Sequence, residues 1–101
     1  MTPRPATIVV VEQSAAVQEL IDQALRDNGD FLLVTQNPLE AIEVARRVRV
    51  DLLVTELTDS TLVDEVRSLQ PDMRVLDLYS NGDDPFALLD LRDRVAEILE
   101  R

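Results

Sequence analysis

Four short apolar runs alternate with four helix-like stretches along this chain, and this alternation restricts the fold more than any other feature. The runs are "TIVVV" (7–11), "FLLVT" (31–35), "DLLVTE" (51–56) and "RVLDLYS" (74–80). Runs of this kind are typical of buried strands, and the stretches after them carry apolar residues at helical spacing. Alternation with short connections favours a parallel sheet with helices on both faces. We therefore predict a three-layer α/β fold with an open parallel sheet.

The predicted helices have recognisable ends and inward faces. Polar side chains can cap a helix, proline suits its first position, and glycine allows a left-handed turn after it. The residues expected in these roles are Ser14, Gly29, Asn37, Pro38, Glu40 (at N3 of a capping box) and Asp84. The third helix, near 60–69, is expected to be short. The apolar residues expected to face inward are Val17, Leu20, Ile21, Ala24, Leu25, Ala41, Ile42, Ala45, Val48, Leu88, Leu91, Val95 and Ile98 or Leu99.

The strands differ in a way that predicts their order. The first and third runs are apolar without interruption, which is typical of central strands buried on both faces. The fourth contains Asp77, and a charge within a strand is a known protection for an exposed edge. We therefore predict strand order 2-1-3-4. The other interpretation of Asp77 is that it faces a helix boundary.

Composition excludes several classes of function. The 101 residues predict one domain, 1–101, with a loose tail at 1–6. The chain has no cysteine and no histidine, which removes thiolate chemistry, the commonest general base and the commonest transition-metal ligand. Only three aromatic residues are present, too few for a platform that stacks bases or sugars. We expect no enzyme activity, no catalytic residue and no cofactor.

The charge balance argues against two kinds of partner. Twenty acidic residues face ten arginines, and the net charge is −10. Such a charge disfavours a nucleic-acid groove and an anionic membrane surface. It serves either solubility or an acidic docking surface. No apolar stretch is long enough to span a membrane, and no apolar core of a signal peptide follows the N-terminus, so we expect a cytoplasmic protein.

Acidic residues follow the predicted strands at the end where such sheets bind ligands. In an open parallel sheet, ligands bind beyond the carboxyl ends of the strands, at the point where strand order reverses. That point lies here between the first and third strands. The residues that the topology gathers on this rim are Glu12, Gln13, Glu56, Asp59, Asp83 and Asp84.

Several segments resemble the receiver domain of response regulators, the CheY-like fold. "IVVVEQSAAVQELIDQAL" is similar to its first strand and helix, and "VDLLVTEL" to the third strand, which ends in the phosphorylated aspartate. "PDMRVLDLYS" resembles the fourth strand, which ends in Thr or Ser, and "DDPFALLDLRDRVAEIL" the last helix. The resemblance covers about residues 8 to 99 in order. It implies signal transduction in a two-component system or phosphorelay.

The positions that carry receiver chemistry depart from the family. Glu12 keeps the first acid. Gln13 stands at the second acid, which helps to bind Mg²⁺ in the family, and Glu56 stands at the phosphoacceptor. Tyr79 stands at the switch Thr/Ser, with Ser80 one residue later, and Asp84 stands at the lysine. Phosphoryl transfer depends on positioning and on cations, which this set lacks. Glu56 is also one methylene too long, a displacement that can cost about 10²-fold in rate.

The resemblance with these departures predicts a non-phosphorylatable pseudo-receiver that acts by protein–protein contact. Glu56 is then either a fixed partial mimic of the phosphorylated state or an inert relic, since one carboxylate carries less charge than a phosphoryl group. The alternative is a module that responds to divalent cations, or that is still phosphorylated, at the acidic rim of Glu12 and Glu56. Glu12 and Glu56 are weak candidates for a metal site, and Asp59, Asp83 and Asp84 could add oxygen ligands to it.

The chain is shorter than a receiver, which has five strands and five helices. Only a tight loop fits between "LYSNG" and "DDPF", so the fourth helix and fifth strand are expected to be missing. Their loss would expose the fourth strand and part of an apolar sheet face, which favours a homodimer. The competing interpretation is that Asp77 and the last helix already protect this edge. The sequence does not identify a further protein partner.

Overall fold

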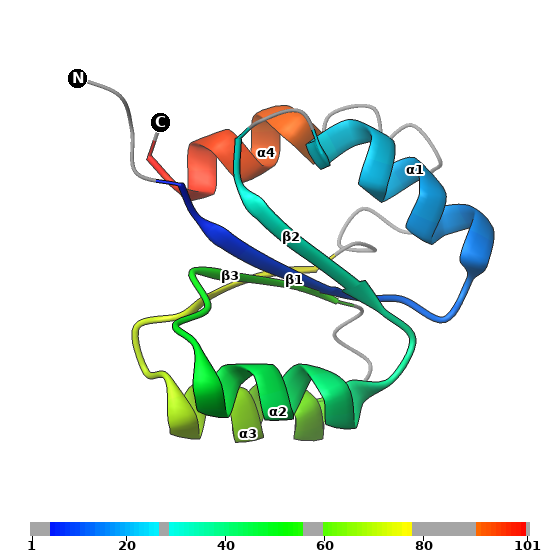
Figure 1. The fold of residues 1–101 in the computed structure, drawn as a ribbon. Coiled ribbons are helices and arrows are strands. Elements are labelled where there is room, and N and C mark those ends of the chain that lie inside the picture. Colours follow the sequence, from blue (N-terminus) through cyan, green and yellow to red (C-terminus); the bar gives the residue numbers. More distant parts are fainter. Residues whose placement is uncertain (1–4, 27–28, 56–59, 78–90, 101) are drawn as a thin grey trace.

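In the described part of the chain, four parallel strands form one sheet with two helices on each face (Figure 1). A computed structural model describes residues 5–26, 29–55, 60–77 and 91–100. The elements in chain order are β1 (Thr7–Val11), α1 (Ala15–Leu25), β2 (Phe31–Thr35), α2 (Pro38–Arg47), β3 (Leu52–Thr55), α3 (Ser60–Leu69), β4 (Arg74–Asp77) and α4 (Leu91–Ile98). The strand order is β2-β1-β3-β4. The predicted fold class and the edge position of the fourth strand are confirmed.

The central strands β1 and β3 are apolar because both of their faces are covered. Ile8, Val9 and Val10 pair in parallel with Leu52, Leu53 and Val54, and all of β3 is buried. Successive side chains of a strand point to opposite faces. The two central strands therefore supply side chains to two separate cores.

The first core lies between the sheet and the helices α1 and α4, which lie on the upper side in Figure 1. Its fully buried side chains are Ile8, Val10, Ile21, Leu25, Leu52, Val54, Leu91 and Val95. The second core lies on the opposite face, beneath α2 and α3, and its most deeply buried members are Val9, Ala41, Val50, Leu53 and Val66. The apolar residues of each helix recur at helical spacing, so each helix has one apolar side that packs against its face of the sheet.

Most of the predicted helix ends are confirmed. The Ser14 hydroxyl caps α1 by accepting from the Val17 N–H at 3.4 Å. Asn37 caps α2 through the Leu39 N–H at 3.0 Å, with Pro38 at the start of the helix. Gly29 has φ of 78°, a conformation that glycine adopts at little cost.

The predicted capping box at α2 is replaced by a relay through the strand. The Asn37 N–H donates to Thr35 Oγ1 at 3.0 Å, and the Thr35 hydroxyl donates to Glu40 Oε2 at 3.0 Å. Glu40 thus supports the helix start through a hydroxyl group, where a capping box would use a direct bond to the cap N–H. The last residue of β2 and the first turn of α2 are tied together.

Two residues predicted to face the core are instead exposed. Leu20 is 51% exposed and Val48 is 49% exposed. Leu20 lies about 100° around the helix from Ile21, at the margin of the apolar stripe. Val48 is the C-cap residue of α2 with φ of −133°, so it no longer follows the helical period.

The predicted segment ends also differ in detail. Ala6, assigned to the loose tail, is buried, and its N–H donates to Asp30 Oδ1 at 2.9 Å. The third strand begins after Asp51. Residues 78–80 of the predicted fourth strand and residues 84–90 of the predicted last helix lie outside the described residues.

Candidate functional site

Glu12 lies at the carboxyl end of β1 and is buried. Its Oε1 accepts from the Ser14 N–H at 3.0 Å, and its backbone carbonyl accepts from Gln18 Nε2 at 2.8 Å. Its own N–H donates to the Thr35 carbonyl at 3.0 Å. The side chain therefore satisfies a backbone N–H at the start of α1, which is the role of a turn-forming carboxylate.

Gln13 is exposed and connects two loops of the rim. Its Nε2 donates to the Gln36 carbonyl at 2.9 Å, and Gln36 Nε2 donates to the Gln13 carbonyl at 3.4 Å. The loop after β1 and the loop after β2 are thus joined by reciprocal amide bonds. An amide can make this link because it donates, which a carboxylate in the same place would not do.

The remaining predicted rim residues and the two residues of the switch position lie outside the part of the chain that the structure describes. They are Glu56, Asp59, Tyr79, Ser80, Asp83 and Asp84. The described strands end at the same side of the sheet: Val10 of β1 pairs with Val54 of β3, and Thr55 of β3 pairs with Asp77 of β4. The carboxyl ends of β1, β3 and β4 are therefore neighbours. The positions of Glu56 and of the switch residues relative to Glu12 stay predictions.

Glu12 and Gln13, the only residues of the predicted rim that the structure describes, do not form a magnesium site by themselves. Hard cations are bound by several oxygen ligands, mainly carboxylates. Among residues 5–26, 29–55, 60–77 and 91–100, no group of three or more acidic side chains could hold a metal ion. The Glu12 carboxylate is bonded to the Ser14 N–H, and the Gln13 amide to Gln36.

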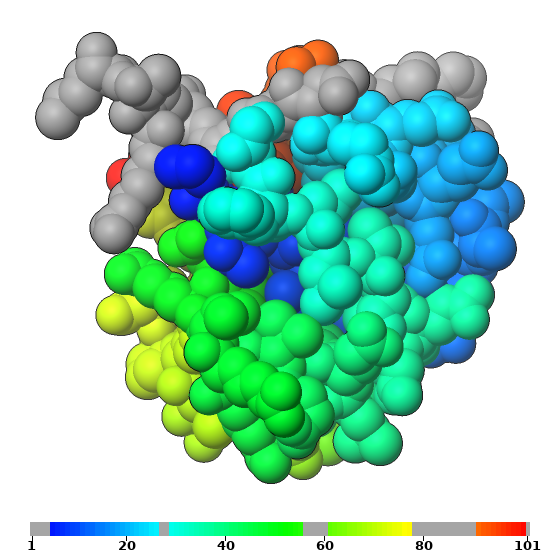
Figure 2. Space-filling view, viewed as in Figure 1, coloured from blue at the N-terminus to red at the C-terminus, as the bar shows by residue number. Residues whose placement is uncertain are grey.

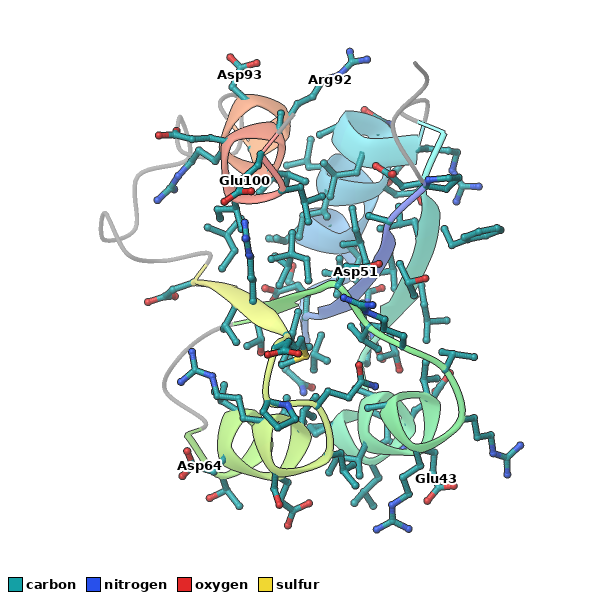
Figure 3. All side chains as sticks on the ribbon, turned by 90° about the vertical axis from the view of Figure 1, so that its left-hand side faces the viewer. Glu43, Asp51, Asp64, Arg92, Asp93 and Glu100 are labelled. Carbon is teal, nitrogen blue, oxygen red and sulfur yellow. The ribbon has the colours of Figure 1, made fainter. Side chains whose placement is uncertain are left out.

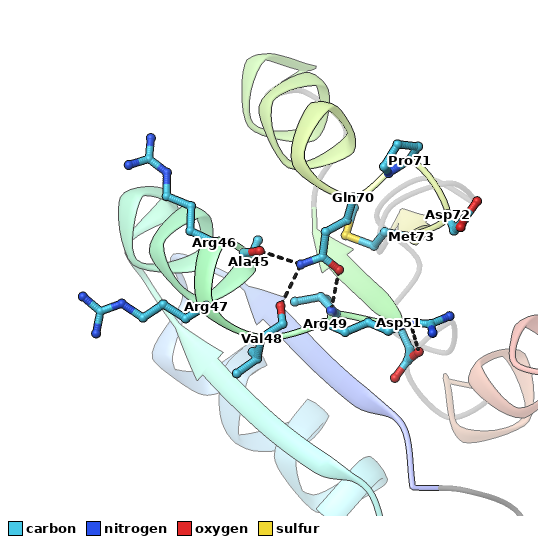
Figure 4. Close-up of a pocket in the computed structure, with 11 residues that line it drawn as sticks. Ala45, Arg46, Arg47, Val48, Arg49, Asp51, Gln70, Pro71, Asp72 and Met73 are labelled. Carbon is cyan, nitrogen blue, oxygen red and sulfur yellow. Dashed lines mark hydrogen bonds and ion pairs between the residues drawn. The ribbon is translucent and has the colours of Figure 1, made fainter.

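A hollow of about 410 Å³ lies at the opposite ends of the strands (Figure 4). The Gln70 side chain lies at its centre. Its Oε1 accepts from the Val50 N–H at 2.6 Å, and its Nε2 donates to the carbonyls of Ala45 and Val48 at 2.6 and 2.7 Å. Gln70 joins the end of α3 to the end of α2 and to the residues before β3. The role is structural, and the sequence interpretation missed it.

Two aspartates support the entry into β1 at the same end of the sheet. Asp51 Oδ2 accepts from the Thr7 N–H at 2.8 Å, and Asp30 Oδ1 accepts from the Ala6 N–H. Asp51 precedes β3 and Asp30 precedes β2, so they flank β1. Figure 3 labels Asp51 at this position. The only signal in the sequence was an acid directly before an apolar run.

In the described residues, no helix has the length and apolar character needed to cross a bilayer. The prediction of a cytoplasmic protein stays a prediction.

Comparison with solved structures identifies the fold. A response regulator from Thermotoga maritima superimposes with a TM-score of 0.77 at 24% identity, over 97% of this chain and 100% of that chain. The receiver domain of the hybrid histidine kinase CckA superimposes with a TM-score of 0.71 at 21% identity, over 93% and 99% of the two chains. The fold is that of a response-regulator receiver domain, reduced here to four strands and four helices in the described residues.

Sequence comparison agrees with this class. The transcriptional regulatory protein QseF of Escherichia coli O157:H7 is 24% identical over all of this chain, which covers 24% of that protein. A response regulator receiver protein of Anaeromyxobacter sp. (strain Fw109-5) is 31% identical over 62% of this chain and 29% of that protein. The chain spans about a quarter of the length of these relatives. No protein-family model matches the chain. The resemblance to receiver domains is confirmed in fold and in sequence.

Proposed function

We propose that this domain is a pseudo-receiver: a receiver fold that is not phosphorylated and that regulates a bacterial two-component-like system by protein–protein contact in the cytoplasm. The observation that carries the proposal is the state of the loop after β1. Its second residue is an amide, Gln13, which donates to Gln36. Its first residue, Glu12, accepts from Ser14. Both side chains that would approach a metal have bonds within the protein.

The residues of the predicted acceptor site support the same proposal. Glu56 follows β3, where receivers have aspartate, and Asp84 replaces the lysine. Phosphoryl transfer needs cations on the developing charge, and a carboxylate in place of the lysine would oppose that charge. Glu56 supplies either a constant negative charge or no signal at all.

A homodimer is part of the proposal. The described sheet has four strands, so both β2 and β4 are edges. An uncovered strand edge favours pairing with another chain. Dimerisation would give the domain a partner surface that does not depend on phosphorylation.

Labelling with acetyl phosphate and Mg²⁺ tests the chemistry. We expect no phosphoryl adduct on the intact protein by mass spectrometry, and the same result for Glu56→Ala. A stoichiometric adduct that is lost in Glu56→Ala would refute the pseudo-receiver and favour the alternative of a receiver that is still phosphorylated.

Thermal unfolding tests the cation-responsive alternative. A ligand that binds only the folded state raises the melting temperature when its concentration exceeds its dissociation constant. We expect the melting temperature to be unchanged by millimolar Mg²⁺ or Ca²⁺. A rise that disappears in Glu12→Gln would support a cation site at the rim.

A further inference from the structure

The outer edge of β2 is an open strand edge between two helices. In the described residues β2 pairs only with β1. Figures 1 and 2 look directly onto this edge, with α1 above it and α2 below it. The five residues of β2, "FLLVT", include no charge, whereas charged side chains are a common protection of exposed edges.

The backbone of β2 has a defined pattern of free hydrogen-bonding groups. The Phe31 N–H donates to the Ala6 carbonyl at 2.9 Å, and the Thr35 carbonyl accepts from Glu12 N–H at 3.0 Å. Alternate residues of a strand bond to the same neighbour. Phe31, Leu33 and Thr35 therefore bond to β1, and the N–H and C=O groups of Leu32 and Val34 point toward the open edge.

This pattern is complementary to itself. In an antiparallel pair of β2 strands from two copies, centred on Leu33, Leu32 lies opposite Val34 of the other copy. Antiparallel pairs alternate between hydrogen-bonded and non-hydrogen-bonded residues. Leu32 and Val34 of the other copy would form a hydrogen-bonded pair that exchanges two bonds, and the two-fold axis generates a second such pair. All five residues of the strand overlap in this register. No like charges meet, since Asp30 comes opposite Gln36.

The side chains at the two ends of the edge fit the same register. Phe31 and Leu39 are each 69% exposed, more than the other large apolar residues of the described chain. Phe31 begins β2, and Leu39 lies in the first turn of α2, next to the end of β2. The two-fold axis through Leu33 brings Phe31 of one copy toward the Thr35 end of the other, and hence toward its Leu39.

The charges along α2 are also complementary in this arrangement. α2 packs on the sheet face over β1 and β2. It has Glu40 in its first turn and Arg46 and Arg47 in its last turn. Glu43 lies between them and pairs with both arginines within the helix. The two-fold axis places two copies of α2 antiparallel on the same face of the joined sheet. The end of each helix that carries Glu40 then faces the arginine end of the other, which offsets part of the repulsion between chains of net charge −10.

We infer that the partner of the β2 edge is a second copy of this chain, joined through antiparallel β2 strands into one continuous sheet. The inference rests on the homodimer of the proposed function and names the surface that makes it. Strand addition of this kind derives affinity from main-chain hydrogen bonds and selectivity from the flanking side chains. The interface is isologous, so it closes at the dimer.

Cysteine cross-linking tests the register, because the chain has no cysteine of its own. Directly opposite residues of a non-hydrogen-bonded pair have Cα atoms about 4.5 Å apart, within the range that a disulfide spans. Under oxidation, Leu33→Cys is expected to form a disulfide-linked dimer. The matched control is Val75→Cys, a half-buried position in the middle of the other edge strand, β4, which is expected to stay uncross-linked.

Charge substitution tests the same surface in the uncross-linked protein, even if a cysteine variant fails to fold. Light scattering from micromolar to near-millimolar chain is expected to give twice the 11.4 kDa chain mass. Phe31→Lys and Leu39→Lys are each expected to raise the dimer dissociation constant about tenfold or more. The control Leu69→Lys, on α3 and 43% exposed, is expected to leave it unchanged.

The possible outcomes separate this inference from the proposed function. A dimer that cross-links through Val75→Cys and not through Leu33→Cys would overturn the β2 interface and leave a homodimer in place. A monomer at all concentrations would overturn both the interface and the homodimer. It would leave the absence of phosphorylation to the acetyl phosphate experiment.

Discussion

The side-chain amide of Gln70 makes three hydrogen bonds with backbone groups of a segment distant in sequence. We therefore expect this single side chain to have a large effect on the stability of the fold. In Gln70→Leu the size is nearly kept, but the Val50 N–H and two carbonyls lose their partner. Leaving buried polar groups unsatisfied costs about 1–3 kcal/mol each at most, and the site is half-buried. We expect a loss of about 2–3 kcal/mol in the free energy of unfolding, measured with urea. The control Gln23→Leu, on the exposed side of α1, is expected to change it by less than about 0.5 kcal/mol.

Glu12 is expected to act through stability and not through metal binding. Glu12→Gln keeps an oxygen that accepts from the Ser14 N–H, whereas Glu12→Ala leaves that N–H without its acceptor. We expect Glu12→Ala to lose about 1–2 kcal/mol of unfolding free energy and Glu12→Gln less than half of that. Urea denaturation in the presence of a chelator would measure both losses. Equal losses in the two variants would mean that the charge, and not the hydrogen bond, is what the fold uses.

At this scale the sequence predicted local roles and missed distant ones. Ser14, Asn37 and Pro38 were found because a helix cap bonds to groups two or three residues away. Gln70 was missed because its partners lie 20 to 25 residues away in the chain, and no spacing rule marks them. The candidate site was predicted from topology and from the resemblance to receivers. Of its predicted residues, the structure describes only Glu12 and Gln13.

The elements themselves were predicted well because each carries its own period. Strand β3 is continuous in apolar residues since both faces are covered, and α2 has an apolar stripe that ends where the helix ends. The wrong predictions concern residues at the end or at the side of an apolar stripe. Val48 belongs to the stripe by number, but its backbone is already extended. Leu20 is apolar and exposed, and periodicity alone does not distinguish a stripe's margin from its centre.

The start of α2 depends on the hydroxyl of Thr35, a buried residue of the neighbouring strand. Thr35→Val keeps the shape and removes the relay, so the Asn37 N–H and the Glu40 carboxylate both lose a bond. We expect a loss of about 1–3 kcal/mol in the free energy of unfolding. Thr35→Ser keeps the hydroxyl and is expected to cost less. If the two variants were equally stable, water would be serving the helix start as well as the hydroxyl does.

The whole molecule is organised around β1 and β3, which contribute side chains to both cores. Leu52 is buried in the core beneath α1 and α4, and its neighbour Leu53 in the core beneath α2 and α3. The two helical layers do not form separate units, because each depends on the same two strands. Loss of packing on one face should therefore destabilise the other as well.

Paired substitutions in β3 test this cooperativity. Leu52→Ala and Leu53→Ala each remove a fully buried side chain, and each is expected to cost about 2–5 kcal/mol in the free energy of unfolding. Hydrogen exchange measured by mass spectrometry should show faster exchange in all four helices for either variant, since a small two-state domain unfolds as one unit. Faster exchange in α1 and α4 alone for Leu52→Ala, with α2 and α3 unchanged, would show instead that the two layers unfold independently and that the shared strands do not couple them.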